Sequence, residues 1–417
     1  MIQIAVLGHG IVGSGVLEVI MKNKDSIGVK AGEGINVKYI LDLKEFPGLP
    51  YSDRFIKDYN VILNDPEISI VVEVMGGIHP AYDFTKAALE KGKSVVTSNK
   101  EVVAEKGGEL LAIAKKNNLN YLFEASVGGG IPIIRPMSQC LAANRLSKIS
   151  GILNGTTNYI LTQMIKNNKT FDNALTEAQE KGYAERNPSA DIEGKDACRK
   201  ICILSSLAFG KHIYPDFVHT EGITSIKLAD VKIAEDAGAV VKLIGCVEKL
   251  KNEKLSVIVA PFVVDSENPL SNVEDVFNGI LVEGDATGDV MFYGKGAGKL
   301  PTASAVVADV IDCVKHIHAR KYLSWEETTR DQAPELVEDY RNYIFSFMVR
   351  VKAEDIKPVK KLCEEIFPQM RAINSHDFGD DTFAFFTNEM KQSDFDTLFE
   401  KVKNYKGVKE SSTLRVL

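Results

Sequence analysis

Four carboxylates and a lysine at the start of an apolar run lie close together in the middle of the sequence, in the stretch AERNPSADIEGKDACRKICILSSLAFG. The acids are Glu185, Asp191, Glu193 and Asp196, and the lysine is Lys200. Carboxylates can hold an ammonium group, and a partly buried lysine can exchange a proton near neutral pH. The stretch therefore predicts a pocket for an amino acid with a hydroxyl to oxidise. The alternative is a solvated row of ion pairs, which is the common fate of such charges.

A helix over residues 191–209 is expected to carry these side chains. Asp196 and Lys200 are spaced i, i+4 in the favourable order, with Glu193 one turn before them. The apolar run that follows Lys200 indicates that this lysine is partly buried. The core face is predicted from four apolar residues at helical spacing: Ala197, Ile201, Leu204 and Ala208.

The chain begins with an apolar run over 2–7, followed by glycines at positions 8, 10 and 13 and an amphipathic helix. This is G-x-G-x-x-G in a strand–turn–helix context, which predicts dinucleotide binding. Gly8 permits the tight turn, Gly10 admits a pyrophosphate and Gly13 allows close packing of helix on strand. Ile11 and Val12 complete the expected cofactor contacts at the helix start. The alternative is a glycine-rich turn that binds nothing.

Further strands are expected over 35–43, 69–77, 94–100 and 120–127, with helices over 81–91 and 105–117. Alternation of strands and helices predicts a parallel, doubly wound α/β sheet of the Rossmann type. Ligands bind beyond the carboxyl ends of such strands, where Gly76 and Lys100 lie. Asp42, at the end of the second strand, could hold the ribose of NAD, whereas Lys44 could meet the 2′-phosphate of NADP. The sequence leaves that choice open.

Two polar stretches follow the last of these strands. In FEASVGGGIPIIRP, Glu124 and the glycine-rich backbone could hold a hard cation, although spacing alone favours a hinge. In GILNGTTNYIL, Asn154, Thr156 and Thr157 predict either a polar pocket wall or a helix N-cap.

The whole chain resembles the homoserine dehydrogenase family. The resemblance implies NAD(P)-dependent interconversion of L-aspartate 4-semialdehyde and L-homoserine, in threonine and methionine biosynthesis. An N-terminal kinase domain is not expected, so the chain is similar to the monofunctional type. The motifs that carry the resemblance are GHGIVGSGV, TSNKEVVAEKGGEL, EASVGGGIPIIRP, GILNGTTNYIL, SADIEGKDACRK and GKGAGKLPTASAVVADV.

The resemblance implies roles for the charged residues. Lys100 and Lys200 would flank the reacting carbon, with Lys200 as the proton donor or acceptor and Asp196 supporting it. Asp191 and Glu185 would hold the amino and hydroxyl ends of the substrate. The chain departs from the family's EPDP-like pattern at ERNP, so substrate contacts there are uncertain.

The resemblance also implies a sodium site and replaces the hinge interpretation. Its ligands would be Glu124 and the carbonyls of Val127, Gly129 and Ile131. Gly298 would contact the cofactor, and a helix that begins near Thr302 would return to the first domain.

Three domains are expected: a Rossmann domain over 1–130, completed by about 299–325, an α+β substrate and dimerisation domain over 131–298, and a C-terminal domain over 340–417. The last has the order β-α-β-β-α-β, which is ferredoxin-like and resembles the ACT domain. Its strands are expected over 343–351, 369–376, 381–388 and 409–417. It lacks the glycine that usually lets a ligand approach the backbone in the first strand–helix turn of ACT domains. Two alternatives therefore stay open: the domain binds threonine, or it serves only in oligomerisation.

Composition and charge restrict the class of protein and its location. The 417 residues carry a formal net charge of −7 and no basic run, which argues against nucleic-acid binding. No apolar run is long enough to cross a membrane and no secretion signal is evident, so a cytoplasmic homodimer or homotetramer is expected. No cysteine is placed as the nucleophile that an aspartate semialdehyde dehydrogenase needs. A non-catalytic amino-acid sensor is the alternative from another class, but it would not need both lysines.

Overall fold

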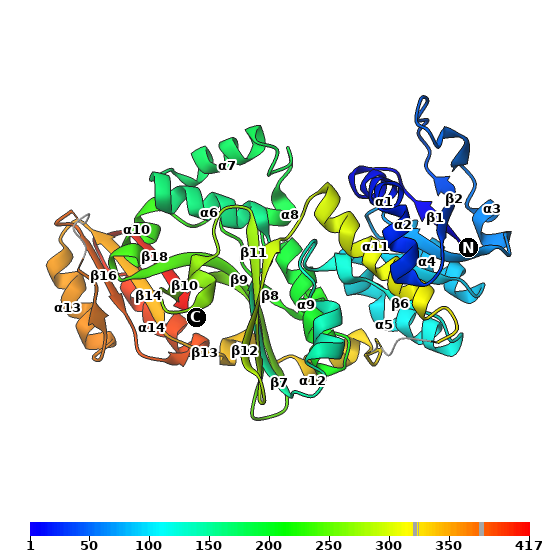
Figure 1. Cartoon of the computed structure of the whole chain (residues 1–417). Coiled ribbons are helices and arrows are strands. Elements are labelled where there is room, and N and C mark those ends of the chain that lie inside the picture. Colours follow the sequence, from blue (N-terminus) through cyan, green and yellow to red (C-terminus); the bar gives the residue numbers. More distant parts are fainter. Residues whose placement is uncertain (320–322, 324, 375–378) are drawn as a thin grey trace. The chain divides into compact units, whose positions relative to one another are not determined.

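The computed structural model describes residues 1–319, 323, 325–374 and 379–417. Two compact units make up the chain (Figure 1), and each consists of three separate stretches. Unit 1 contains Met1–Leu146, Cys202–Pro215 and Glu283–Ala333. Unit 2 contains Ser147–Ile201, Asp216–Val282 and Pro334–Leu417.

Unit 1 is built on a parallel sheet in the strand order β3-β2-β1-β4-β5-β6. Its central strands are almost wholly buried, as expected for a parallel sheet that is covered on both faces. The predicted Rossmann-type sheet is therefore confirmed. The strands are β1 (Ile2–Leu7), β2 (Ile35–Leu41), β3 (Phe55–Ile56), β4 (Ile68–Glu73), β5 (Ser94–Thr97) and β6 (Tyr121–Leu122).

The helices of unit 1 include one from late in the chain, α11, which packs on α1. A Cβ added to Gly15 of α1 would lie 2.9 Å from the Lys299 oxygen of α11, so the two helices approach at a glycine. The helices are α1 (Ile11–Lys22), α2 (Lys24–Ala31), α3 (Tyr59–Asn64), α4 (Ala81–Glu90), α5 (Lys100–Lys116) and α11 (Lys299–Lys315), and strand β12 (Gly288–Lys295) precedes α11.

The strands expected over 69–77 and 94–100 end at Glu73 and Thr97, and two further expected boundaries in unit 1 were also wrong. Helix α5 begins five residues earlier than expected, because the Asn99 side chain accepts hydrogen bonds from the N–H groups of Glu101 and Val102 and caps the helix at Lys100. The strand expected over 120–127 is only Tyr121–Leu122. It stops because the chain turns at Glu124–Ser126, where the Asp309 side chain binds the Glu124 N–H.

Unit 2 contains a mixed sheet in the strand order β11-β7-β9-β10-β18-β14-β16-β15, with β8 beside β10. Strands β9 and β10 pair antiparallel along their whole length. The strands are β7 (Leu146–Ile152), β8 (His219–Thr220), β9 (Ala239–Lys249), β10 (Leu255–Asp265), β11 (Phe277–Gly284), β14 (Phe347–Ala353), β15 (Arg371–Ala372), β16 (Thr382–Phe386) and β18 (Val408–Val416). The helices are α6 (Gly155–Asn167), α7 (Phe171–Glu180), α8 (Ser189–Ile192), α9 (Lys195–Phe209), α10 (Leu228–Asp236), α12 (Ala333–Leu336), α13 (Ile356–Ile366) and α14 (Gln392–Lys403).

The last part of unit 2 has the predicted ferredoxin-like arrangement. Its order along the chain is β14-α13-β15-β16-α14-β18, and its antiparallel sheet runs β18-β14-β16-β15. Strand β18 also pairs in parallel with β10, so this layer continues the sheet of unit 2. The strand expected over 369–376 is Arg371–Ala372, and residues 375–378 lie outside the described residues.

The single helix expected over 191–209 was wrong. The chain forms α8, turns at Gly194 in the left-handed region (φ +82°), and then begins α9 at Lys195. A Cβ at Gly194 would meet the Glu221 oxygen at 3.1 Å, so glycine suits both the angle and the space. The break separates Glu193 from the face that carries Asp196 and Lys200, and Glu193 instead pairs with the exposed Lys195.

Candidate active site

Four side chains of unit 2 form a buried polar cluster at the start of α9. Asn154, at the end of the loop after β7, donates its amide hydrogens to Asp191 Oδ1 at 2.7 Å and Asp196 Oδ2 at 2.8 Å. Lys200 Nζ donates to the same Asp196 oxygen and to the Leu153 carbonyl, both at 2.8 Å. The side-chain oxygen of Asn154, Oδ1, accepts the Thr157 N–H and so caps α6. The N-cap predicted for this stretch is therefore confirmed, and the same side chain is also a member of a polar cluster.

The Asp196–Lys200 pair is not solvated. The side chains are 6% and 9% exposed, so the solvated row of ion pairs proposed from sequence is wrong. A buried ion pair persists when further hydrogen bonds offset its desolvation. Asn154 and the Leu153 oxygen supply those bonds here.

Of the two acids expected to hold the substrate, the structure brings one into this cluster. Asp191 is half-buried in α8 and bonds to Asn154. Glu185 lies exposed in the loop after α7, where its main-chain oxygen accepts a hydrogen bond from Gln179. Thr156, also in the predicted polar stretch, donates to the Tyr183 oxygen of that loop.

The glycine turn of unit 1 has the shape that dinucleotide binding requires. Gly8 has φ +96°, and a Cβ at Gly13 would lie 2.0 Å from the Gly8 oxygen, so both must be glycine. A Cβ at Gly10 would meet nothing within 4 Å. Gly10 is the N-cap of α1 and supplies no side-chain cap, which leaves the helix start to a ligand such as a phosphate. Ile11 is exposed and Val12 half-buried in the same first turn.

Asp42 follows β2 and is held by the backbone of two loops. Its Oδ2 accepts the His9 N–H at 2.8 Å and its Oδ1 accepts the Lys44 N–H at 2.9 Å. His9 was not predicted as part of this region. Its ring packs edge-on against Phe46 and Phe55, and burial lowers the pKa of His9. The sequence shows only that His9 lies between two glycines, and this position does not by itself predict a role.

The remaining cofactor candidates lie in unit 1 at strand ends and helix starts. Lys100 is the first residue of α5, directly after the Asn99 cap. Gly76 and Gly77 follow β4 with φ of +99° and +71°. Gly298 has φ +124° and is the N-cap of α11.

The turn after β6 contains the residues expected to hold a cation. The Glu124 carboxylate accepts the N–H groups of Ile133 and Ile134 on Oε1 and that of Arg135 on Oε2. Its main task here is therefore to order the loop. Among the described residues, no group of three His, Cys, Asp or Glu side chains could hold a metal ion. A cation would depend on main-chain oxygens, and no hydrogen bond from the described residues reaches those of Val127, Gly129 and Ile131.

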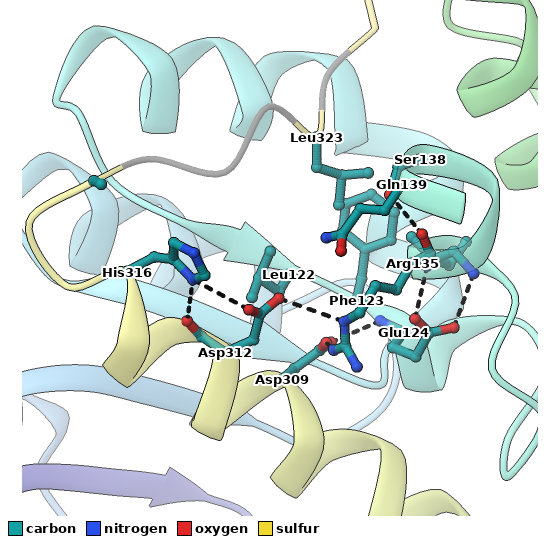
Figure 2. A pocket seen from close by; sticks show the side chains of 12 residues that line it. Leu122, Phe123, Glu124, Arg135, Ser138, Gln139, Asp309, Asp312, His316 and Leu323 are labelled. Carbon is teal, nitrogen blue, oxygen red and sulfur yellow. Dashed lines mark hydrogen bonds and ion pairs between the residues drawn. The ribbon is translucent and has the colours of Figure 1, made fainter. Parts of the chain in front are cut away.

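A cavity of about 420 Å³ opens beside this turn, and sequence reasoning missed its charged lining. Figure 2 shows Arg135 bonded to Asp309, and His316 bonded to Asp312. Burial and the neighbouring Glu124 raise the pKa of Asp309 to about 7, against the opposing effect of Arg135. Arg135 and Asp309 are 174 positions apart, so no local pattern could have paired them.

The parallel sheet with its glycine turn, together with a lysine buried against a carboxylate, defines an NAD(P)-dependent oxidoreductase. Comparison with known proteins makes the assignment more specific. Residues 8–124 match the sequence model described as "Homoserine dehydrogenase, NAD binding domain", and residues 132–311 match "Homoserine dehydrogenase". The chain belongs to the homoserine dehydrogenase family.

Relatives and solved structures agree with that assignment. The homoserine dehydrogenase of Synechocystis sp. is 44% identical over 320 residues, which cover 75% of this chain and 73% of that protein. The crystal structure of a homoserine dehydrogenase from Thiobacillus denitrificans is 32% identical, with a TM-score of 0.89 over 100% of this chain and 98% of that chain. A hyperthermophilic archaeal homoserine dehydrogenase mutant, solved in complex with NADPH, is 30% identical, with a TM-score of 0.65 over 75% of this chain and 97% of that chain.

In the part of the chain that the structure describes, no helix is long and apolar enough to cross a bilayer.

Proposed function

We propose that this chain interconverts L-homoserine and L-aspartate 4-semialdehyde in threonine and methionine biosynthesis, and that the substrate binds at the cluster of Asn154, Asp191, Asp196 and Lys200. The observation that carries the proposal is the Lys200 ammonium, which is buried and bonded to one carboxylate and one main-chain oxygen. An ammonium has three N–H donors. We assign the third to the oxygen on the reacting carbon of the substrate.

Lys200 moves the proton in this scheme. In the reduction, its ammonium gives a proton to the oxygen of the former aldehyde, and in the oxidation its amine takes that proton back. Asp196 holds the nitrogen in place and stabilises the ammonium form. When bound, the nicotinamide of NAD(P) supplies or accepts the hydride. Lys100 adds positive charge beside the developing alkoxide.

Asp191 and Glu185 orient the substrate through its ammonium group and its hydroxyl end. Asp191 is supported in this role by its bond to Asn154, which fixes the carboxylate beside the lysine. Glu185 is proposed on family resemblance alone, since its carboxylate lies on an exposed loop. It would have to turn inward when the substrate binds.

The cofactor is assigned to the strand ends of unit 1. The first turn of α1, at Gly10, Ile11 and Val12, would bind the pyrophosphate, with Gly8 and Gly13 shaping the turn. Asp42 would accept hydrogen bonds from the adenosine ribose, while Gly76, Lys100 and Gly298 would contact the nicotinamide half.

A monovalent cation, sodium by family resemblance, is proposed at the main-chain oxygens of Val127, Gly129 and Ile131, with Glu124 ordering the loop. Oxygen ligands suit such a hard cation. Turnover measured in sodium chloride and in the chloride of a bulky organic cation, at equal ionic strength, tests this. Equal rates would remove the cation from the proposal.

Threonine is proposed as a regulator bound to the ferredoxin-like part, and a homodimer or homotetramer as the assembly. A cavity of about 640 Å³ at the edge of this layer supports the threonine proposal, because Asp265, Arg371 and Glu389 line it and offer both charges that an amino acid needs. Inhibition by threonine that is lost in Arg371→Ala would support this site.

We also propose a reducing, cytoplasmic location, since all six cysteines are thiols in the described residues.

The test of the main proposal is L-homoserine oxidation at alkaline pH with NAD+ and NADP+ in parallel. Lys200→Ala should lower kcat by about 10²–10⁴-fold, the usual contribution of a positioned proton-transfer group. Lys195→Ala is the matched control, because Lys195 lies on the same helix with its side chain 60% exposed. An intact protein that turns over neither cofactor, or a Lys200→Ala variant as active as the control, would refute the assignment.

A further inference from the structure

Glu73 is a buried carboxylic acid in the parallel sheet of unit 1, at the end of a strand that is otherwise mostly apolar. It is the last residue of β4 and has no exposed surface. Burial raises the pKa of Glu73 against the effect of its hydrogen bonds. An apolar residue would avoid this desolvation cost, so the carboxyl group needs an explanation.

The two oxygens of Glu73 bind two different loops. Oε1 accepts the N–H of Met75 at 2.8 Å, in the loop that continues to Gly76 and Gly77. Oε2 accepts the hydroxyl of Thr97 at 2.6 Å, at the end of the neighbouring strand β5. Glu73 and Thr97 are partners in the register of the parallel pair, so both side chains leave the sheet at the same level.

The contact continues from Thr97 to the start of α5. Thr97 Oγ1 accepts the N–H of Asn99 at 2.9 Å. The Asn99 amide donates to the Gly77 oxygen at 2.7 Å, and its own oxygen caps the helix that begins with Lys100. Glu73, Thr97 and Asn99 therefore form a closed connection between the loop after β4 and the loop after β5.

The same loop reaches the glycine turn of β1. A Cβ at Gly8 would lie 3.2 Å from both the Met75 side chain and the Val74 oxygen, so the Met75 segment packs directly on Gly8. This packing does not involve the Glu73 hydrogen bonds, so the turn at Gly8 that is proposed to hold the pyrophosphate should persist when Glu73 is replaced.

We infer that Glu73 is a positioning residue for the reaction: through Met75, Thr97 and Asn99 it fixes Gly76, Gly77 and Lys100, and so it sets the nicotinamide half of the cofactor site and not the adenosine half. Glu73 has no exposed surface, so it acts through these residues. The inference rests on the proposed function for the role of Lys100, whereas its effect on cofactor binding does not require catalysis.

Two isosteric variants test the connection. In Glu73→Gln the amide oxygen still accepts the Met75 N–H, but an amide nitrogen replaces the oxygen that accepts the Thr97 hydroxyl, so this hydroxyl loses its acceptor. Thr97→Val removes the hydroxyl and keeps the shape, and Thr97→Ser keeps the hydroxyl. Val95→Ala is the control for lost packing, since Val95 is fully buried on β5 and outside the connection.

Each variant is measured for melting temperature, for turnover, and for the Kd of NAD(P)H and of ADP-ribose, which has no nicotinamide. We expect Glu73→Gln and Thr97→Val to lower kcat at least tenfold and to weaken NAD(P)H binding severalfold, with the Kd of ADP-ribose within twofold of the parent. Thr97→Ser should behave like the parent. If Glu73→Gln does not fold, Thr97→Val decides.

The inference is overturned if NAD(P)H and ADP-ribose weaken together, or if kcat falls no further than in Val95→Ala at an equal loss of melting temperature. A parent protein without turnover would refute the proposed function instead, and the ratio of the two Kd values would still decide the role of Glu73.

Discussion

Asn154 donates its two amide hydrogens to two different carboxylates, Asp191 and Asp196. The first is proposed to hold the substrate and the second holds Lys200. One neutral side chain thus bridges two like charges and holds them close together. Because its side-chain oxygen caps α6, the same residue fixes the cluster to a helix start.

Replacing Asn154 should therefore impair both stability and catalysis. Asn154→Ala removes an N-cap, which costs about 0.5–2 kcal/mol, and leaves Asp191 and Asp196 to repel each other. We expect a rise in the KM for homoserine and about a tenfold fall in kcat/KM. Steady-state kinetics and thermal unfolding measure the two effects.

Thr170→Ala separates them, because Thr170 caps the neighbouring helix α7 outside the cluster. It should lower the melting temperature by a similar amount and leave kinetics unchanged. Equal kinetic losses in both variants would mean that Asn154 acts only as a cap.

Asp42 should decide the choice between NAD and NADP. Two backbone N–H groups fix its carboxylate, which suits a ribose hydroxyl and repels a 2′-phosphate. Asp42→Ala should raise the ratio of kcat/KM for NADP+ over NAD+ by tenfold or more, since a hydrogen bond to a charged group contributes about 1.5–3 kcal/mol. Glu45→Gln, which removes a nearby exposed carboxylate paired with Lys57, is the control. An unchanged ratio would mean that another residue, such as Lys44, selects between NAD and NADP.

The buried Lys242 should make the free energy of unfolding depend on pH in the alkaline range. It is buried in β9, where Nζ donates to the Val273 oxygen at 2.6 Å, and burial lowers its pKa to about 8. Between about pH 8 and 10.5 the unfolded chain holds a proton on this group that the folded chain has released, so stability should rise with pH across that window.

Lys242→Met should lose this rise, because methionine has no group that titrates. The variant also removes the hydrogen bonds of Lys242 to the Val273 oxygen and to Asn158 Oδ1, while Asn158 still donates to the Val273 oxygen. Melting temperatures at closely spaced pH values measure it, with the exposed Lys251→Met as the control. A parallel curve for Lys242→Met and the parent would contradict the assignment.

Gly222 should be intolerant of any side chain. A Cβ there would lie 2.0 Å from the Ile192 oxygen and 2.5 Å from the Glu193 Cα, at the turn that separates α8 from α9. Gly222→Ala should displace this turn, lower the melting temperature by several degrees and reduce kcat/KM, because Asp191 and Asp196 lie on either side of it. Gly28→Ala, in helix α2 where the nearest atoms are 3.9 Å away, should leave kcat/KM unchanged and should not lower the melting temperature, because a helix favours alanine over glycine. Normal kinetics in Gly222→Ala would show that the cluster does not depend on this turn.

The sequence predicted the parallel sheet of unit 1 and the ferredoxin-like layer, because buried parallel strands appear as apolar runs and the ferredoxin-like order follows from alternating strand and helix patterns. The strands β7, β9, β10 and β11 of unit 2 were not predicted. It failed at Gly194, since apolar spacing continues across the break and hides it. Asn154 reaches Asp191 over 37 positions, and such a contact has no local signature. Glu73 was missed because an acid at the end of a strand normally points to solvent. The roles of Lys100, Glu185 and the proposed cation ligands stay predictions.

Each unit takes its residues from three separated stretches of the chain. During synthesis, unit 1 therefore cannot close until residues near 333 have left the ribosome, although its sheet is encoded by the first 122. Until α11 arrives, the face of α1 at Gly15 has no partner and stays open to chaperones or to aggregation. For the same reason, no single cleavage of the chain can release either unit whole.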